Sequence, residues 1–287
     1  MQNTPFSTNK TLNINGRLID LGIPKVMGVL NVTPDSFYDG GQFLSESSIL
    51  EHAEKMLSEG ADFIDVGGYS SRPGAADISP AEEKERSVKA ISSIVRNFPG
   101  TIISIDTFRS SVAEAAVDAG ASMVNDISGG NPDQEMFQTV SRLKVPYILM
   151  HMKGNPQTMD GLTQYTNLMK ELIDYFHEKI HAIRPFEVKD IIIDPGFGFS
   201  KTLEQNFNIL NNLEKLSILG KPVLVGLSRK SMIWKTLEVQ PTGALNGTTA
   251  LNTMALLKGA DILRVHDVRE AREVIKLFTS LQVNVSR

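Results

Sequence analysis

The chain has 287 residues, of which 41% are hydrophobic and 22% charged, as in an ordinary globular protein that can bury a sizeable core. Its formal net charge of −4 gives no long-range attraction to nucleic acids or membrane surfaces, so neither is an expected partner. The sequence contains no cysteine, which excludes a disulfide framework and a thiolate zinc site. Because residues 1–20 lack the pattern of a secretory signal, we expect a cytoplasmic location.

Eight short apolar runs lie along the chain, and each is followed, after a loop, by a segment with helical spacing. The predicted strands are Val26–Val32, Phe63–Val66, Ile102–Asp106, Met123–Asp126, Tyr147–His151, Ile191–Asp194, Val223–Leu227 and Ile262–Val265. The predicted helices are Ser48–Glu59, Pro80–Asn97, Ser110–Ala119, Gln134–Leu143, Thr166–Ile183, Leu203–Leu216, Gly243–Lys258 and Val268–Leu281.

This alternation, repeated over roughly 250 residues, predicts an α/β fold of the (β/α)8 TIM barrel class. A doubly wound open sheet is the competing arrangement, but no Gly-x-Gly-x-x-Gly phosphate loop follows the first strand. We expect a single domain over residues 1–287, with the barrel at about residues 24–282.

Two smaller elements are also predicted. Asn15-Gly16 between alternating apolar residues is typical of a two-residue hairpin, here over residues 11–19, and we expect this hairpin to close the bottom of the barrel. The run Ser231–Leu237 predicts a short extra helix before the seventh main helix, where such barrels often build an anion site.

Polar side chains close all the predicted strands. Turns favour polar residues at such points in any protein, but the working face of a TIM barrel also lies at the carboxyl ends of its strands. A set that mixes carboxylates, amides and cations favours a polar binding site there. The residues are Asn31, Asp65, Asp106, Asn125 with Asp126, His151, Asp194, Arg229 with Lys230, and Arg264 with His266.

Asp194 stands at the end of the most apolar strand and is followed by Pro195 and Gly196. A carboxylate desolvated in this way needs a cation or several N–H donors as partners. A ligand edge could supply the donors, and Arg229 and Lys230 on the next turn could supply the charge. An internal Asp194–Lys230 pair is the structural alternative.

Arg264 and His266 are two residues apart on the eighth strand and therefore point to the same side. The planar fork of an arginine suits phosphate oxygens, and a histidine beside it can act neutral or charged, so the pair indicates a phosphorylated leaving group. A salt bridge to Asp267 or Glu270 is the alternative. We expect His151 to be a packed histidine rather than a ligand.

Two loops are unusually long and rich in glycine and proline: Thr33–Ser45 and Gly67–Ser79. Loops of this kind are often lids over an active site. Asp35, Ser71 and Arg72 give them polar and charged content that a plain connector does not need.

Taken together, these motifs resemble dihydropteroate synthase, and they occur in the order of that family over residues 25–268. The matching segments are Asn31-Val-Thr-Pro-Asp-Ser-Phe37, Ser70-Ser-Arg-Pro-Gly-Ala75, Asn125-Asp-Ile127, Met150-His-Met152, Asp194-Pro-Gly-Phe-Gly-Phe199, Ser228-Arg-Lys-Ser231 and Arg264-Val-His-Asp-Val268. The resemblance implies a homodimeric transferase that joins 6-hydroxymethyl-7,8-dihydropterin diphosphate to para-aminobenzoate with Mg²⁺. The products would be pyrophosphate and 7,8-dihydropteroate, in the folate-forming step that sulfonamides block.

The resemblance also implies roles for individual residues. The pterin pocket would use Asp106, Asn125, Asp194 and Lys230, with Phe199 lining it. Arg264 and His266 would hold the diphosphate, Asn31 would associate with the magnesium ion, and Asp35 would act with the metal and diphosphate. Ser71 and Arg72 would lie near the aminobenzoate. Because the pterin ring can delocalise positive charge from the departing methylene carbon, we expect a dissociative displacement without a covalent enzyme intermediate.

One motif departs from the family pattern. The family commonly reads Gly-Gly-Glu-Ser-Thr-Arg-Pro-Gly, whereas this chain has Tyr69 in place of the glutamate and Ser71 in place of the threonine. We expect these changes to affect aminobenzoate and sulfonamide contacts rather than the reaction. Two rival functions are a pterin-binding methyltransferase barrel, which has no use for a pyrophosphate site, and a non-catalytic pterin-binding barrel.

Overall fold

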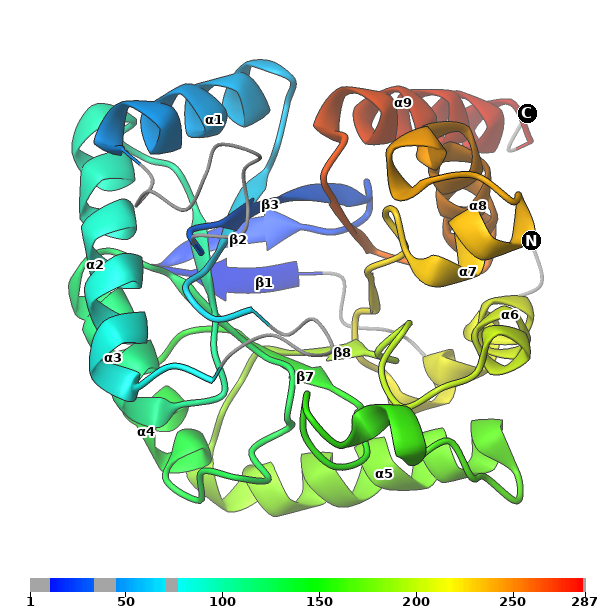
Figure 1. Cartoon of the computed structure of the whole chain (residues 1–287), viewed down its shortest axis with the longest axis horizontal. Coiled ribbons are helices and arrows are strands. Elements are labelled where there is room, and N and C mark those ends of the chain that lie inside the picture. The colour runs from blue at the N-terminus through cyan, green and yellow to red at the C-terminus, as the bar shows by residue number, and fades with distance from the viewer. Residues whose placement is uncertain (1–10, 34–44, 71–76, 286–287) are drawn as a thin grey trace.

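The computed structural model describes residues 11–33, 45–70 and 77–285, which form a barrel of parallel strands surrounded by helices (Figure 1). The barrel strands are β3 (Lys25–Asn31), β4 (Phe63–Gly67), β5 (Ile103–Asp106), β6 (Met123–Asp126), β7 (Tyr147–Met150), β8 (Ile191–Asp194), β9 (Leu224–Val225) and β10 (Ile262–Val265). They pair in the order β8-β7-β6-β5-β4-β3-β10-β9. A parallel bridge between Ile193 and Val223 joins the two ends of this sheet, so the predicted TIM barrel is confirmed.

A helix follows each barrel strand. The helices are α1 (Glu46–Ser58), α2 (Pro80–Asn97), α3 (Ser110–Asp118), α4 (Met136–Leu143), α5 (Leu168–Ile183), α6 (Leu203–Asn211), α8 (Leu245–Leu257) and α9 (Val268–Val285). The predicted extra helix is α7 (Ser231–Thr236), and short 3-10 helices lie at Met159–Gly161, Arg184–Phe186, Leu213–Leu219 and Pro241–Gly243. Ser45, Ser79 and Thr202 cap α1, α2 and α6 by accepting backbone N–H groups of the first turn.

Two predicted elements are shorter in the structure by three residues or more. The predicted strand Val223–Leu227 is reduced to the two residues of β9, because Val223 forms only an isolated bridge and Gly226 has no side chain to pack. The predicted helix Leu203–Leu216 ends at Asn211. Asparagine is a poor helix former, and the side chain of Asn212 donates to the carbonyl of Asn208, which satisfies the helix end.

The hairpin closes the bottom of the barrel, as predicted. Strands β1 (Thr11–Ile14) and β2 (Arg17–Asp20) pair antiparallel, and Asn15 and Gly16 between them have φ angles of 52° and 80°, as this tight turn requires. Leu12 packs in one apolar cluster with Phe63 and Met123, the first residues of β4 and β6. The amino ends of the strands are therefore sealed by apolar side chains.

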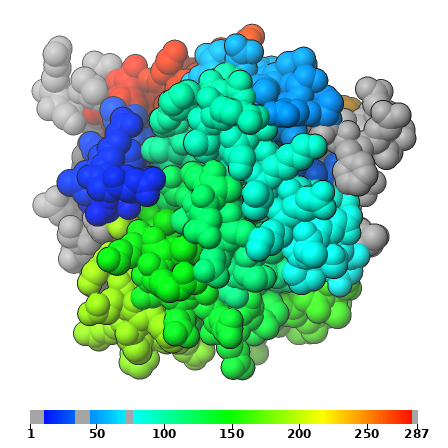
Figure 2. Space-filling view, turned by 90° about the vertical axis from the view of Figure 1, so that its left-hand side faces the viewer, coloured from blue at the N-terminus to red at the C-terminus, as the bar shows by residue number. Residues whose placement is uncertain are grey.

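The side of the barrel is covered by neighbouring helices. Helices α2, α3 and α4 form a continuous wall in cyan and green, while the hairpin, in deep blue, lies at one end of the molecule (Figure 2). This leaves the carboxyl ends of the strands, at the opposite end from the hairpin, as the face on which a site can be built. No helix in the described part of the chain is long and apolar enough to cross a membrane.

We expect the substitution Leu12→Ala to lower the free energy of unfolding by about 2–4 kcal/mol, because it opens a cavity in the sealed bottom of the barrel. Leu12 is 1% exposed, whereas Leu18 on the same hairpin is 70% exposed and provides a matched control. Urea unfolding of both variants tests this. Equal losses for Leu12→Ala and Leu18→Ala would contradict the role of the hairpin as a packed plug.

Candidate active site

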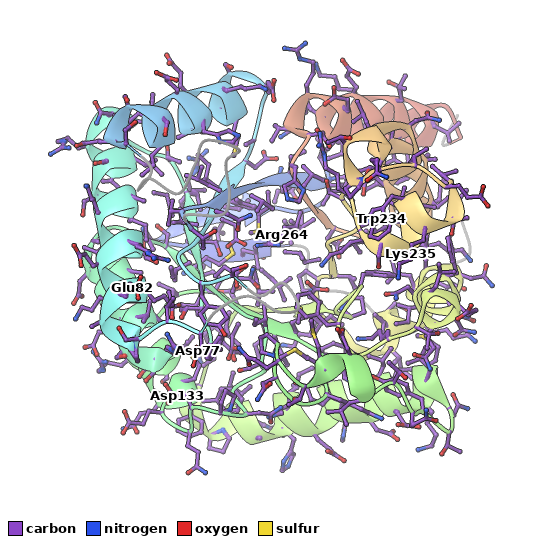
Figure 3. The ribbon with its side chains drawn as sticks, viewed as in Figure 1. Asp77, Glu82, Asp133, Trp234, Lys235 and Arg264 are labelled. Carbon is purple, nitrogen blue, oxygen red and sulfur yellow. The ribbon has the colours of Figure 1, made fainter. Side chains whose placement is uncertain are left out.

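An ion-pair cluster lies at the carboxyl ends of β4, β5 and β10. Arg264 donates from Nε to Oδ2 of Asp65 at 2.6 Å and from Nη2 to Oδ2 of Asp106 at 2.7 Å. The side chain of Asp65 has no exposed surface, and that of Asp106 is 15% exposed. Arg264 lies near the centre of the barrel (Figure 3). Two carboxylates therefore share one guanidinium, and the salt bridge to Asp267 or Glu270 considered from the sequence is not the one that Arg264 makes.

The charges of this cluster shape its protonation. The pKa of Asp106 is raised to about 7, mainly by burial, with Arg264 opposing the rise and Asp65 adding to it. Burial also opposes the charged form of Arg264, but Asp65 and Asp106 outweigh that effect and raise its pKa. Arg264 is therefore permanently charged, and Asp106 can exchange a proton near neutral pH.

Asn125 and Asp194 reach the same end of the barrel from β6 and β8. Asn125 donates from Nδ2 to Oδ2 of Asp65 at 2.9 Å. Oδ1 of Asp194 accepts the backbone N–H of Gly196 at 2.7 Å. Burial raises the pKa of Asp194, and the Gly196 N–H and Lys230 counteract that rise. Among the described residues Asp194 forms no ion pair with a cation, so the internal Asp194–Lys230 pair is not formed.

Lys230 faces Asp194 from the turn after β9. Its Nζ lies 4.4 Å from the ring centroid of Phe199, and its stem passes Gly198, where a Cβ would be only 3.2 Å from Cδ of Lys230. Burial, with the charge of Arg264, lowers the pKa of Lys230 to about 8. The ammonium thus stands in a partly desolvated position beside an aromatic face.

Arg229 was predicted to be available to Asp194, and that prediction is wrong. Its guanidinium forms a two-pronged salt bridge with Asp267, at 3.0 Å from Nε and 2.6 Å from Nη2. Its backbone has a φ of 55°, a left-handed conformation that is costly for arginine, and its N–H donates to Oγ1 of Thr248. Arg229 therefore fixes the turn that presents Lys230 and does not itself face the site.

His266 lies at the rim of the site, two residues after Arg264. Its backbone N–H donates to Oγ of Ser228 at 3.2 Å, and its Nδ1 lies 3.1 Å from the same oxygen. The surrounding protein and then Arg264 lower the pKa of His266, although the exposed part of the ring moderates this effect. The ring is therefore mostly neutral at neutral pH, and its Nε2 edge is free of hydrogen bonds to the described residues.

Sequence reasoning missed Lys201, which lies under the site and is 8% exposed. Its Nζ donates to the carbonyls of Gly196 at 3.0 Å and Phe199 at 2.9 Å, and lies 3.1 Å from Nδ1 of His151. His151 is 2% exposed and packs edge-on against Tyr175, so it is the packed histidine that the sequence predicted. Lys201 ties the turn after β8 to the end of β7.

Comparison with known proteins identifies the family. A family model described as pterin binding enzyme matches residues 27–266. The dihydropteroate synthase of Synechocystis sp. is 46% identical over 259 residues, which cover 89% of each chain. The chain belongs to the dihydropteroate synthase family.

Solved structures agree. The Yersinia pestis dihydropteroate synthase in a sulfonamide drug complex matches with a TM-score of 0.90 and 37% identity, over 95% of this chain and 99% of that one. The Xanthomonas albilineans dihydropteroate synthase with 4-aminobenzoic acid matches with a TM-score of 0.88 and 37% identity, over 96% and 99%.

Within this dihydropteroate synthase fold, Tyr69 is buried rather than exposed in a loop. It is 7% exposed, its ring packs edge-on against Phe108 at 5.1 Å, and its hydroxyl accepts Nε2 of Gln157 at 2.6 Å. Arg109 lies 5.3 Å from the Tyr69 ring centroid and pairs with the buried Glu83. Tyr69 therefore joins the end of β4 to the loops after β5 and β7.

Asn31 ends β3 next to Gly67 and Asp106. Its Oδ1 lies 3.3 Å from the place that a Cβ on Gly67 would take, so the glycine gives this amide oxygen its room. The described residues contain no group of three or more His, Asp or Glu side chains placed to hold a metal ion. Three other predicted site residues, Asp35, Ser71 and Arg72, lie outside the described residues.

Lys201 should make stability depend on pH. Burial lowers its pKa from 10.5 to about 7. Between these values the unfolded chain keeps the proton that the folded chain has lost, so the stability contribution of this group rises with pH through the window and is lost as pH falls toward about 7. We expect the free energy of unfolding, measured in urea at several pH values, to rise less steeply with pH in Lys201→Met than in the unmodified protein. Parallel pH profiles would show that the ammonium is not desolvated.

Proposed function

We propose that this member of the dihydropteroate synthase family condenses 6-hydroxymethyl-7,8-dihydropterin diphosphate with para-aminobenzoate and releases pyrophosphate. The observation that carries the proposal is the convergence of Asp106, Asn125, Asp194 and Lys230 inside the barrel mouth, with Arg264 among them and His266 at the rim. Acceptors and cations thus line one site together. This arrangement suits a donor-rich heterocycle that carries an anionic group.

The pterin would occupy the inner part of the site. Asp194 has one oxygen held by Gly196, and its second oxygen makes no hydrogen bond with the described residues, so the carboxylate can accept from a ring N–H and an exocyclic amino group. Lys230 would donate to the carbonyl side of the ring. Phe199, against which Lys230 already packs, would line the face of the pterin.

The diphosphate would lie toward the rim, where the Nε2 edge of His266 is available and the guanidinium of Arg264 lies two residues earlier on the same strand end. The family implies Mg²⁺, and Asn31 fits that expectation, because Mg²⁺ is commonly held by few protein oxygens together with substrate phosphates. When bound, Mg²⁺ would neutralise charge on the diphosphate. Asp35 of the first loop would act with the metal and the diphosphate.

The chemistry needs no covalent enzyme intermediate. The bond between the methylene carbon and the diphosphate oxygen breaks, the bonding pair leaves with pyrophosphate, and the aniline nitrogen of para-aminobenzoate forms the new bond before losing its proton to solvent. Contacts of the diphosphate with Arg264 and His266 would favour the leaving group, and the site orients the two substrates. Ser71 and Arg72 would contact the aminobenzoate, the ligand that the Xanthomonas albilineans relative carries.

Pyrophosphate release from the pterin diphosphate, para-aminobenzoate and Mg²⁺ tests the function. We expect release that depends on both organic substrates. Binding of the pterin without release would instead favour a non-catalytic pterin-binding barrel. Transfer of a methyl group from methyltetrahydrofolate to a corrinoid would favour the methyltransferase alternative.

We further propose that the chain acts as one domain in the cytoplasm and forms a homodimer. Helices α8 and α9 pack together, and their outer faces carry the exposed side chains Met254, Leu257, Leu277 and Leu281, which are 51% to 73% exposed. A second copy of the chain could bury this apolar face. We expect the unmodified protein to sediment as a dimer and Leu277→Arg to sediment as a monomer. A monomeric unmodified protein would exclude the dimer.

The diphosphate contact is best tested at His266. Arg264→Ala would also leave Asp65 and Asp106 without their cation, so it would damage the pterin end as well. His266→Ala removes the rim contact, together with the ring's contact with Ser228, but leaves the carboxylates at the pterin end with their cation. We expect it to weaken binding of the pterin diphosphate by about tenfold but to change binding of 6-hydroxymethylpterin by less than about twofold, as calorimetry would measure. Equal losses for the two ligands would place His266 at the pterin instead.

A further inference from the structure

Asp65 is the buried centre of the site, and the proposed substrate contacts leave it without a role. Its side chain has no exposed surface, so it cannot meet a ligand directly. Oδ2 accepts both Nε of Arg264 at 2.6 Å and Nδ2 of Asn125 at 2.9 Å. Oδ1 has no hydrogen-bond partner among the described residues. Oδ2 of Asp65 therefore binds two residues that are themselves proposed to contact the ligand.

A carboxylate can only accept hydrogen bonds, which decides how the amide of Asn125 is oriented. The nitrogen of Asn125 must face Asp65, and its oxygen must face away. We find no hydrogen bond to Oδ1 of Asn125 within residues 11–33, 45–70 and 77–285, and this atom is not among the buried polar atoms sealed without a partner. Asn125 thus presents its carbonyl oxygen, an acceptor, to whatever occupies the site.

The same oxygen also fixes Arg264. With Nε held by Asp65, the guanidinium plane is set, and Nη2 meets Asp106 at 2.7 Å. A planar fork held at two edges keeps its direction, whereas a single contact would let it rotate. Asp65 therefore acts on the site indirectly, through Asn125 and through the Arg264–Asp106 pair.

We propose that Asp65 is a positioning residue that makes the site selective for a ligand with an N–H donor at Asn125, because it locks that amide with its oxygen toward the ligand. This inference rests on the proposed pterin function and extends it to a residue that touches no substrate. An amide free to flip could accept or donate at this point, and the site would lose part of its discrimination between a pterin and an isostere with the reversed hydrogen-bond pattern.

A double-mutant cycle between Asp65 and Asn125 tests the proposal, with 6-hydroxymethylpterin as the ligand and calorimetry as the measurement. Asp65→Asn keeps the shape of the side chain, but the introduced amide can donate a hydrogen bond. Asn125 can then turn its oxygen toward position 65 and away from the ligand. We expect about tenfold weaker binding in the otherwise unmodified protein. In the Asn125→Ala background we expect Asp65→Asn to cost less than about threefold, because only the route through Arg264 and Asp106 remains. Equal fold losses in the two backgrounds would overturn the proposal.

A second variant gives the answer without altering Asp65. Asn125→Asp replaces the donor by an acceptor that opposes the carboxylate of Asp65, and we expect it to weaken binding at least as much as Asn125→Ala. Affinity retained within about twofold would mean that Asp65 does not require a donor there, which also overturns the proposal.

The matched control is Ser104→Ala. Ser104 stands beside Asp65 in the register of β4 and β5 and is fully buried, but its hydroxyl makes no hydrogen bond with the described residues. We expect Ser104→Ala to leave pterin affinity unchanged, and a loss equal to that of Asp65→Asn would show a general packing effect in place of positioning. If the unmodified protein does not bind 6-hydroxymethylpterin, the proposed function fails and this inference with it; if it binds and the cycle is additive, only the inference fails.

Discussion

The structure of the site depends on one guanidinium shared by two carboxylates, of which Asp65 is fully buried. Asp65 and Asp106 come from neighbouring strands, and both accept hydrogen bonds from Arg264, whose removal would leave them without a cation. The three side chains carry more negative than positive charge, which burial alone would penalise. The arrangement therefore contributes less to the stability of the barrel than to ligand binding. A ligand rich in N–H donors, together with Lys230, would compensate the excess negative charge of the cluster.

The fold separates this polar cluster, whose burial is unfavourable, from the part of the barrel that provides stability. At the amino ends of the strands the interior is filled by apolar side chains such as Met27, Phe63 and Ile262, and the hairpin seals them with Leu12. At the carboxyl ends the same interior positions carry Asp65, Asp106, Asn125, Asp194 and Arg264. Because one end packs and the other binds, a substitution at one end should leave the task of the other largely intact.

The sequence predicts the strands and their polar ends well because both follow from local patterns. Apolar runs of strand length, alternating with segments of helical spacing, suffice for the TIM barrel, and the end of each run marks its catalytic edge. Pairings could not be predicted in the same way. Arg264 meets Asp65 across 199 positions of sequence, and that contact exists only once the barrel has closed.

Backbone conformation hides other assignments. Arg229 and Lys230 are adjacent cations, and from the sequence either could pair with Asp194. The left-handed φ of Arg229 directs Arg229 toward Asp267 and Lys230 into the site. Lys201 gives no sequence signal at all, since a lysine in a loop is ordinarily exposed. Its burial arises because the turn after β8 folds back on the end of β7 and presents several carbonyls to one ammonium.

Strand parity separates the polar ends that bind from those that support. Side chains alternate between the two faces of a strand, so Asn125 and Asp126 point in opposite directions. Asn125 points into the barrel and meets Asp65, whereas Asp126 points outward, accepts the hydroxyl of Tyr147 at 2.6 Å and receives the N–H of Ser128. Burial raises the pKa of Asp126 and these hydrogen bonds lower it, so this carboxylate is satisfied entirely within the fold.

Asp65 points into the barrel, as Phe63 does two residues earlier on the same strand, and this direction can be inferred from the sequence once the barrel is assumed. The polar strand ends thus form two sets of residues. One set faces the interior of the barrel and is available to a ligand, and the other set binds the strands to the surrounding loops.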